Sequence, residues 1–172
     1  MDIQKINPTQ VAVKWALIYL LLEIILTYIW KIFNIDLGIG FWGICLHLFP
    51  VIAFTFLTQR QYRDQLNGDM TFDEGFSAGF RFTVISTLLI AAFIYLYLSL
   101  FSPDIFEKSL THIRTRLVLK GRSPQHIEKQ IRDIRRFGPG GFAFLYIIMQ
   151  GITGILISLV GAAIFKRKKT SV

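Results

Sequence analysis

Four side chains within apolar parts of the sequence carry the groups most able to do chemistry: Glu23, His47, Tyr95 and Gln150. An ionised carboxylate is costly near the middle of a bilayer, so Glu23 should be neutral, paired or hydrated, and should face protein. A carboxylate beside a histidine or an amide is the arrangement of a proton-coupled or ligand-binding site. The alternative is that these groups only form hydrogen bonds between helices and hold a small bundle together.

The depths of these four side chains favour a common location. At 1.5 Å per residue, Glu23, His47, Tyr95 and Gln150 lie about 12, 8, 9 and 13 Å from the same membrane face. We therefore expect an intramembrane polar cluster with one member from each apolar stretch. The two halves of the sequence show no repeat of the kind that many transporters have.

Four apolar stretches must position these residues, and each approaches the roughly 20 residues that cross about 30 Å of hydrocarbon. They cover residues 9–33, 38–58, 76–101 and 141–165. At 53% hydrophobic residues, the chain has more apolar surface than a soluble domain of 172 residues can bury. We expect an all-α polytopic membrane protein with four transmembrane helices, forming a single membrane domain over residues 1–172.

Local signals mark where helices begin and bend. Pro50, inside the second stretch, should kink the helix or free a backbone carbonyl. Thr71 and Glu74 have the spacing of a capping box, which predicts that the third helix starts before the membrane.

Residues 102–140 form the main polar region and predict an extramembrane helical hairpin between the third and fourth spans. Each helix begins with Ser-Pro, at Ser102 and Ser123, and the two end near Gly121 and Gly138. Apolar residues line one face of each helix, so the hairpin is amphipathic and either closes on itself or lies on the membrane surface. These residues are Phe106, Leu110, Ile113 and Leu117, then Ile127, Ile131 and Ile134.

The positive charge is concentrated in two places. The chain carries 19 Lys and Arg against 11 Asp and Glu, and residues 102–141 hold nine of the basic residues with four acids. Next to a membrane, anionic lipid headgroups are a nearer partner for such cations than nucleic acid, although a merely solvated face is the simpler alternative. The candidate headgroup contacts are Arg132, Arg135, Arg136, Lys166, Arg167, Lys168 and Lys169.

The orientation depends on the balance of Lys and Arg on the two sides of the membrane. With four spans, nine basic residues lie on the side of the termini and ten on the side of the hairpin. The compact basic cluster at residues 166–169, with no acid beside it, favours cytoplasmic termini.

Small residues recur at helical spacing in the fourth stretch, at Gly151, Gly154, Ser158 and Gly161. In lipid such a small-residue stripe lets a second helix approach closely. The partner helix is either another helix of the same bundle or one from a second copy or a membrane protein partner.

No segment has the pattern of a catalytic, cofactor or metal site. Cys45 is the single cysteine, and neither His112 nor His126 has metal-ligand spacing. Phosphate-binding glycine loops and serine elbows are also missing from the sequence. We expect a protein that is not an enzyme, with no catalytic residues and no cofactor.

Several short motifs together resemble a known family. They are the segment 71–76, the Phe-Ser-Pro-Asp at 101–104, the Gly-Arg-Ser-Pro at 121–124, the Phe-Gly-Pro-Gly at 137–140 and the basic tail. This order resembles an uncharacterised family of small bacterial four-helix inner-membrane proteins, a domain-of-unknown-function family. The resemblance implies a bacterial inner-membrane protein with both termini cytoplasmic, and it implies no particular activity.

Two functions are consistent with these patterns. The first is a small non-enzymatic membrane subunit, scaffold or interaction protein, whose hairpin contacts lipid headgroups or a partner. The second is a minimal proton-coupled transporter or channel-like protein that uses the intramembrane polar cluster.

Overall fold

The computed structural model describes residues 7–33 and 41–167, with the backbone alone for residues 41–46. All regular structure in these residues is helical, which confirms the all-α class. The elements are α1 (Pro8–Ile32), α2 (Phe41–Gln65), α3 (Phe72–Leu96), the π-helical turn η1 (Tyr97–Phe101), α4 (Pro103–Leu119) and α5 (Pro124–Phe165). The chain divides into two compact units at Ile90 and Met149, and α3 and α5 each contribute to both.

Among the described residues, three segments are long and apolar enough to cross a membrane, so the protein is membrane-embedded. They are α1, α3 continued through η1, and α5. The helix α2 is as long as α1, at 25 residues, but its last turns from Gln59 to Gln65 are polar. It therefore runs seven residues past the expected end of its apolar stretch, and it remains helical through Pro50. Residues 38–40, the expected start of that stretch, lie outside the described residues.

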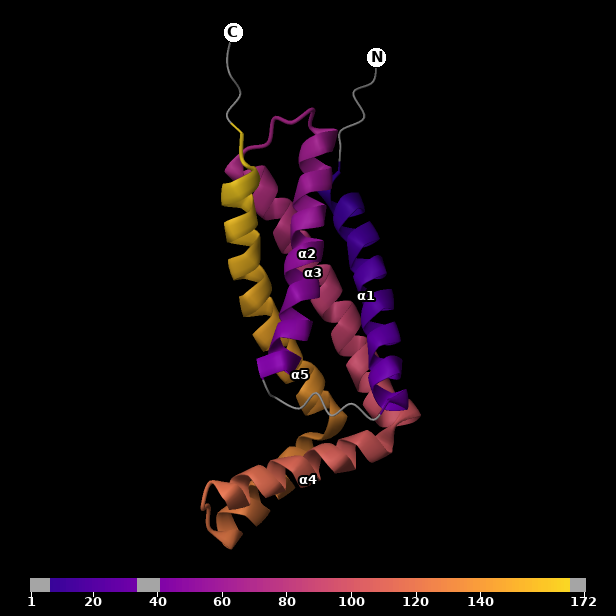
Figure 1. Ribbon diagram of the computed structural model, residues 1–172, viewed down its shortest axis with the longest axis vertical. Helices are drawn as coiled ribbons and strands as arrows, with labels where there is room; N and C mark the ends of the chain where they lie inside the picture. The colour runs from indigo at the N-terminus through magenta and orange to yellow at the C-terminus, as the bar shows by residue number, and fades with distance from the viewer. Residues whose placement is uncertain (1–6, 34–40, 168–172) are drawn as a thin grey trace. The chain divides into compact units, whose positions relative to one another are not determined.

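The first unit consists of α1, α2, most of α3 and the last part of α5, which run alongside one another (Figure 1). The turn from α2 to α3 has strong local signals. At the end of α2, Gly68 has φ +87° and donates its backbone N–H to the Arg63 carbonyl at 3.0 Å. At the start of α3, the Thr71 N–H donates to the Glu74 carboxylate at 2.8 Å, and the Glu74 N–H donates to the Thr71 hydroxyl at 3.3 Å. The predicted capping box is confirmed, and it starts α3 four residues before the expected apolar stretch.

A small core closes the end of the first unit where α1 begins and α2 ends. Its buried members are Val11, Tyr62, Met70 and Ala78, with Trp15, Leu66 and Phe165 packed against them. The backbone N–H of Arg167 donates to the Met70 carbonyl at 2.8 Å, so the chain after α5 is fastened to the α2–α3 turn.

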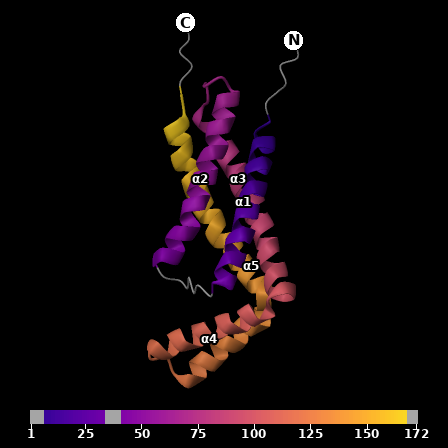
Figure 2. The same cartoon turned by 45° about the vertical axis from the view of Figure 1, so that its right-hand side comes forward.

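The second unit contains the end of α3, η1, α4 and the first part of α5. In it α4 and the first part of α5 lie side by side, connected by the turn at residues 120–123 (Figure 2). Gly121, at φ +66°, ends α4: the Arg122 N–H donates to the Leu117 carbonyl, as in a Schellman motif. Apolar residues from both helices are buried, so each helix covers the apolar face of the other. These are Phe106, Leu110, Ile127 and Ile131.

The predicted helix boundaries in this region are confirmed, because α4 begins at Pro103 and α5 at Pro124. Within α5 the backbone leaves the helical conformation at Gly138, with φ 58° and ψ −158°, directly before Pro139. That conformation is essentially restricted to glycine. The predicted stop signal therefore acts as a break that separates a polar helix from an apolar one.

Candidate functional site

The structure brings together two members of the predicted intramembrane polar cluster. Glu23 on α1 is only 6% exposed, and its Oε1 lies 3.7 Å from Nδ1 of His47 on α2. The hydroxyl of Tyr19, one turn earlier on α1, also interacts with the Glu23 carboxylate. A carboxylate and an imidazole at this distance form an ion pair when the imidazole is protonated.

The position of Glu23 follows from the packing of α1. The buried residues Ala12, Ala16, Tyr19 and Glu23 recur every three or four positions and form one face of the helix. The Tyr19 ring packs on Phe54 of α2, with ring centroids 5.4 Å apart, and on Phe82 of α3 at 6.0 Å. Glu23 is on the same face one turn further on, so its side chain is directed between α2 and α3 rather than to lipid.

The other two predicted members differ in their location. Gln150 is buried, 4% exposed, on the part of α5 that belongs to the first unit. Tyr95 belongs to the second unit and is 49% exposed. The structure therefore does not unite all four residues.

The small-residue stripe on α5 packs largely against helices of the same chain. A Cβ added at Gly154 would collide with the side chain of Thr83 on α3. Ser158 is fully buried, and its Oγ would lie 2.8 Å from a Cβ added at Gly79 of α3. A Cβ at Gly151, in contrast, would meet no described atom within 4 Å.

Gln59, a fully buried residue on α2, is the polar contact that the sequence patterns missed. Its Nε2 donates to the carbonyl of Gly75 on α3 at 3.0 Å and to the carbonyl of Ser158 on α5 at 2.8 Å. Its Oε1 has no conventional donor among the described residues, but it occupies the place where a Cβ on Gly161 would lie. The Cα–H of Gly161 therefore points at this oxygen, an arrangement typical of close helix contacts. The signal that could have revealed this contact is a glutamine on one helix that faces glycines on two other helices.

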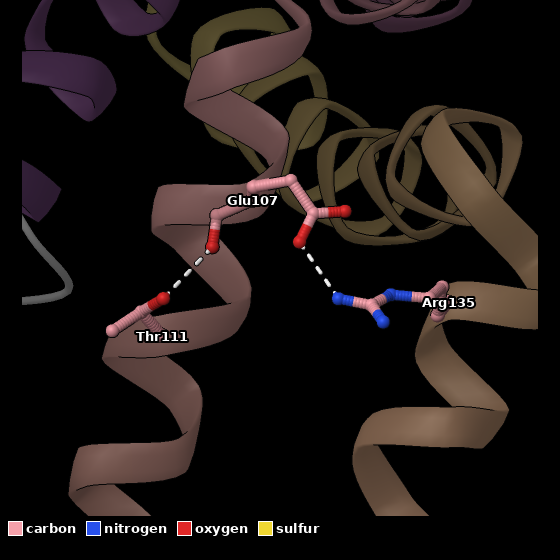
Figure 3. A network of polar contacts seen from close by, with 3 residues as sticks. All are labelled: Glu107, Thr111 and Arg135. Atoms are coloured by element: carbon pink, nitrogen blue, oxygen red, sulfur yellow. Dashed lines mark hydrogen bonds and ion pairs between the residues drawn. The ribbon is translucent and has the colours of Figure 1, made fainter.

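The predicted headgroup residues fall into two groups. Arg135 donates to the Glu107 carboxylate on α4 at 2.7 Å, while the backbone carbonyl of Glu107 accepts from the Thr111 hydroxyl (Figure 3). Arg132 and Arg136 are exposed and form no ion pair with any residue that the structure describes. In the tail, Lys166 and Arg167 are exposed, whereas Lys168 and Lys169 lie outside the described residues.

Lys129, which was not among the predicted headgroup contacts, joins Arg132 and Arg136 on one helical face. The three are separated by three and four residues on the first part of α5, and all three are exposed. We call them the cationic face. Glu107 pairs with Arg135 and Glu128 pairs with Arg114, while the exposed Asp133 beside Arg132 forms no ion pair with any described residue. Three cations against one neighbouring free acid leave the cationic face with an excess of positive charge among the described residues.

The fold and these contacts define an all-helical, membrane-embedded protein with polar side chains buried between its helices. The chain belongs to a family of proteins of unknown function, DUF4199, whose sequence model matches residues 14–167. The expected membership of a domain-of-unknown-function family is thereby confirmed. No match was found among curated proteins or among solved structures.

Proposed function

We propose that the protein crosses a bacterial inner membrane four times, with α2 as the fourth span and both termini in the cytoplasm. The support for α2 is its packing along α1. Trp15 Nε1 donates to Gln61 Oε1 at 2.7 Å, and Glu23 lies beside His47, so α2 accompanies α1 over that whole length. A helix packed along a membrane-crossing helix occupies the same depth of the bilayer.

In this proposal the protein is not an enzyme but a small subunit or scaffold whose amphipathic hairpin, α4 with the first part of α5, contacts anionic lipid headgroups. The observation that carries it is the cationic face, Lys129, Arg132 and Arg136, exposed and without ion pairs among the described residues. Arg136 lies two residues before the break at Gly138, beyond which α5 is apolar, so the cationic face is close along the chain to the membrane surface. Each such cation contributes about 1 kcal/mol at an anionic surface.

Exposed apolar side chains accompany these cations. Phe137, next to Arg136, is 73% exposed, and Leu119 at the end of α4 is 81% exposed. Lys120 and Arg122 follow Leu119 in the turn between the two helices. Apolar groups beside unpaired cations match the boundary between headgroups and acyl chains.

The test compares charge-neutralised variants of the full-length protein. Purified protein in nanodiscs that contain phosphatidylcholine with phosphatidylglycerol is released into a mass spectrometer, and the retained anionic lipids are counted. The Lys129→Gln/Arg132→Gln/Arg136→Gln variant should retain fewer. The matched control Arg114→Gln/Arg135→Gln, which removes cations already paired within the chain, should behave like wild type. Equal lipid retention in the two variants would rule out headgroup binding by the cationic face. If a protein co-purifies with wild type and is lost only from the first variant, the cationic face binds a protein partner and not lipid.

A second candidate function, a minimal proton-coupled transporter or channel-like protein, is favoured by the 3.7 Å contact between Glu23 and His47. In proteoliposomes with a pH-sensitive dye inside, wild type should carry protons and Glu23→Gln should not, although both fold. If Glu23→Gln is silent while Glu23→Ala unfolds the bundle, Glu23 is a structural hydrogen-bonding group and this candidate fails.

A further inference from the structure

The contacts between α3 and α5 extend to a pair of buried polar residues. Gly75 faces Ala162, Gly79 faces Ser158 and Thr83 faces Gly154, so each step moves four residues along each of two antiparallel helices. The next step places Thr87 opposite Gln150. Both are 4% exposed.

The contacts of α1 bring Glu23 to the same level. Tyr19 packs on both Phe54 and Phe82. One turn further along α1 lies Glu23, and one turn further along the parallel α3 lie Ser86 and Thr87. His47 of α2 contacts Glu23 directly. Glu23, His47, Ser86, Thr87 and Gln150, drawn from all four helices of the first unit, therefore form one polar layer.

Two oxygens of the polar layer are left without hydrogen bonds. Glu23 Oε1 and Thr87 Oγ1 are buried and have no hydrogen-bond partner among the described residues. A bound ion or water is one way in which buried polar atoms of this kind are satisfied. Carboxylate, hydroxyl and amide oxygens are the ligand types that hard metal cations prefer.

The charge of the layer selects the kind of cation. Glu23 is its only carboxylate, so one bound monovalent ion neutralises it, whereas a divalent ion would leave an excess positive charge in a region from which water is excluded. His47 Nδ1 lies 3.7 Å from the same Glu23 oxygen, and Ser86, Thr87 and Gln150 contribute neutral groups.

We propose that the polar layer binds one sodium-sized alkali cation through Glu23, Thr87 and Gln150. The site shares Glu23 and His47 with the second candidate function, but it requires only equilibrium binding and no transport. A negative result in the proton-flux assay therefore does not contradict the sodium site. A negative result in the sodium-binding assay likewise does not contradict proton transport.

The test measures the melting temperature of the purified protein in detergent at mildly alkaline pH, in sodium chloride and in choline chloride of equal concentration. Saturating sodium should raise the melting temperature of wild type by about 5 °C over choline. Glu23→Gln should abolish this difference and Thr87→Val should reduce it. Thr83→Val is the matched control, because it changes the same residue type one turn earlier on α3 and should keep the sodium effect.

A second measurement uses wild type alone, so it tests the proposal even if the variants do not fold. Equilibrium binding of radioactive sodium to wild type should saturate at about one ion per chain, and choline should not displace the bound sodium. The proposal is overturned if sodium and choline give equal melting temperatures, if the sodium effect persists in Glu23→Gln, or if wild type binds no radioactive sodium.

Discussion

At the scale of single residues, the strongest constraint lies where Gln59 meets the glycines of α3 and α5. Its amide group serves two carbonyls on different helices, and its oxygen fills the space that a side chain on Gly161 would need. In lipid, an apolar side chain gains little by packing against protein instead of against acyl chains. Close polar contacts such as these therefore favour one arrangement of the helices over others.

Gly161→Ala should therefore destabilise the protein by about 1–3 kcal/mol, because the added Cβ would overlap the Gln59 amide oxygen. Thermal unfolding in detergent measures the effect. The control is Gly151→Ala, whose Cβ meets no described atom within 4 Å. That variant should be unchanged or up to about 1 kcal/mol more stable, since alanine favours helix.

The same contact predicts that the two positions are coupled. In a double-mutant cycle, Gln59→Ala should remove most of the added cost of Gly161→Ala, because the overlapping group is then absent. Fully additive costs would show that the steric conflict at residue 161 does not involve Gln59.

At the scale of elements, α5 matters most because its 42 residues contain two different segments. Its first part pairs with α4 through Arg135 and Glu107 and through Arg114 and Glu128, and its last part packs in the first unit. The change occurs at Gly138, whose φ and ψ no other residue adopts at low cost.

Gly138→Ala should cost about 1–3 kcal/mol, because an alanine held in this conformation is strained. Alternatively the strain is relieved by a local rearrangement of the backbone around residue 138, which would make this segment more susceptible to protease. Thermal unfolding and limited proteolysis together detect both responses. Gly140→Ala, where nothing lies within 4 Å of the new Cβ, is the control and should show neither.

At the scale of the whole molecule, the orientation in the membrane depends on a small difference in the number of basic residues on the two sides. In the proposed four-span topology, the counts of Lys and Arg on the two sides differ by one residue, nine against ten. Several cations on the hairpin side are already paired with acids, namely Lys108, Arg114 and Arg135. Lys166 and Arg167, in contrast, directly follow α5 and are exposed.

We predict that a fluorescent-protein fusion at the C-terminus reports a cytoplasmic location and that alkaline phosphatase inserted at Arg122 is active outside. Because the balance is so even, replacing residues 166–169 by glutamine should produce mixed or inverted orientation. An active phosphatase at the C-terminus of wild type would contradict the proposed topology and place the cationic face in the cytoplasm.

The sequence by itself determined the features that depend on neighbours along the chain. The capping box at Thr71 and the helix starts at Pro103 and Pro124 follow from local geometry and were correct. The length of the second apolar stretch could not show that α2 continues to Gln65, because the polar residues that follow the stretch extend the same helix.

Only the tertiary structure decided which residues of different helices meet. Contacts of this kind join Glu23 to His47, Gln59 to Gly161, and Arg135 to Glu107, and they depend on the register of the packed helices. Depth estimates placed Tyr95 level with Glu23, but depth says nothing about which way a side chain points, and Tyr95 is half exposed in the other unit. Direction is set by the packing of whole helices, and for that reason the sequence could nominate polar residues but not select those that share a site.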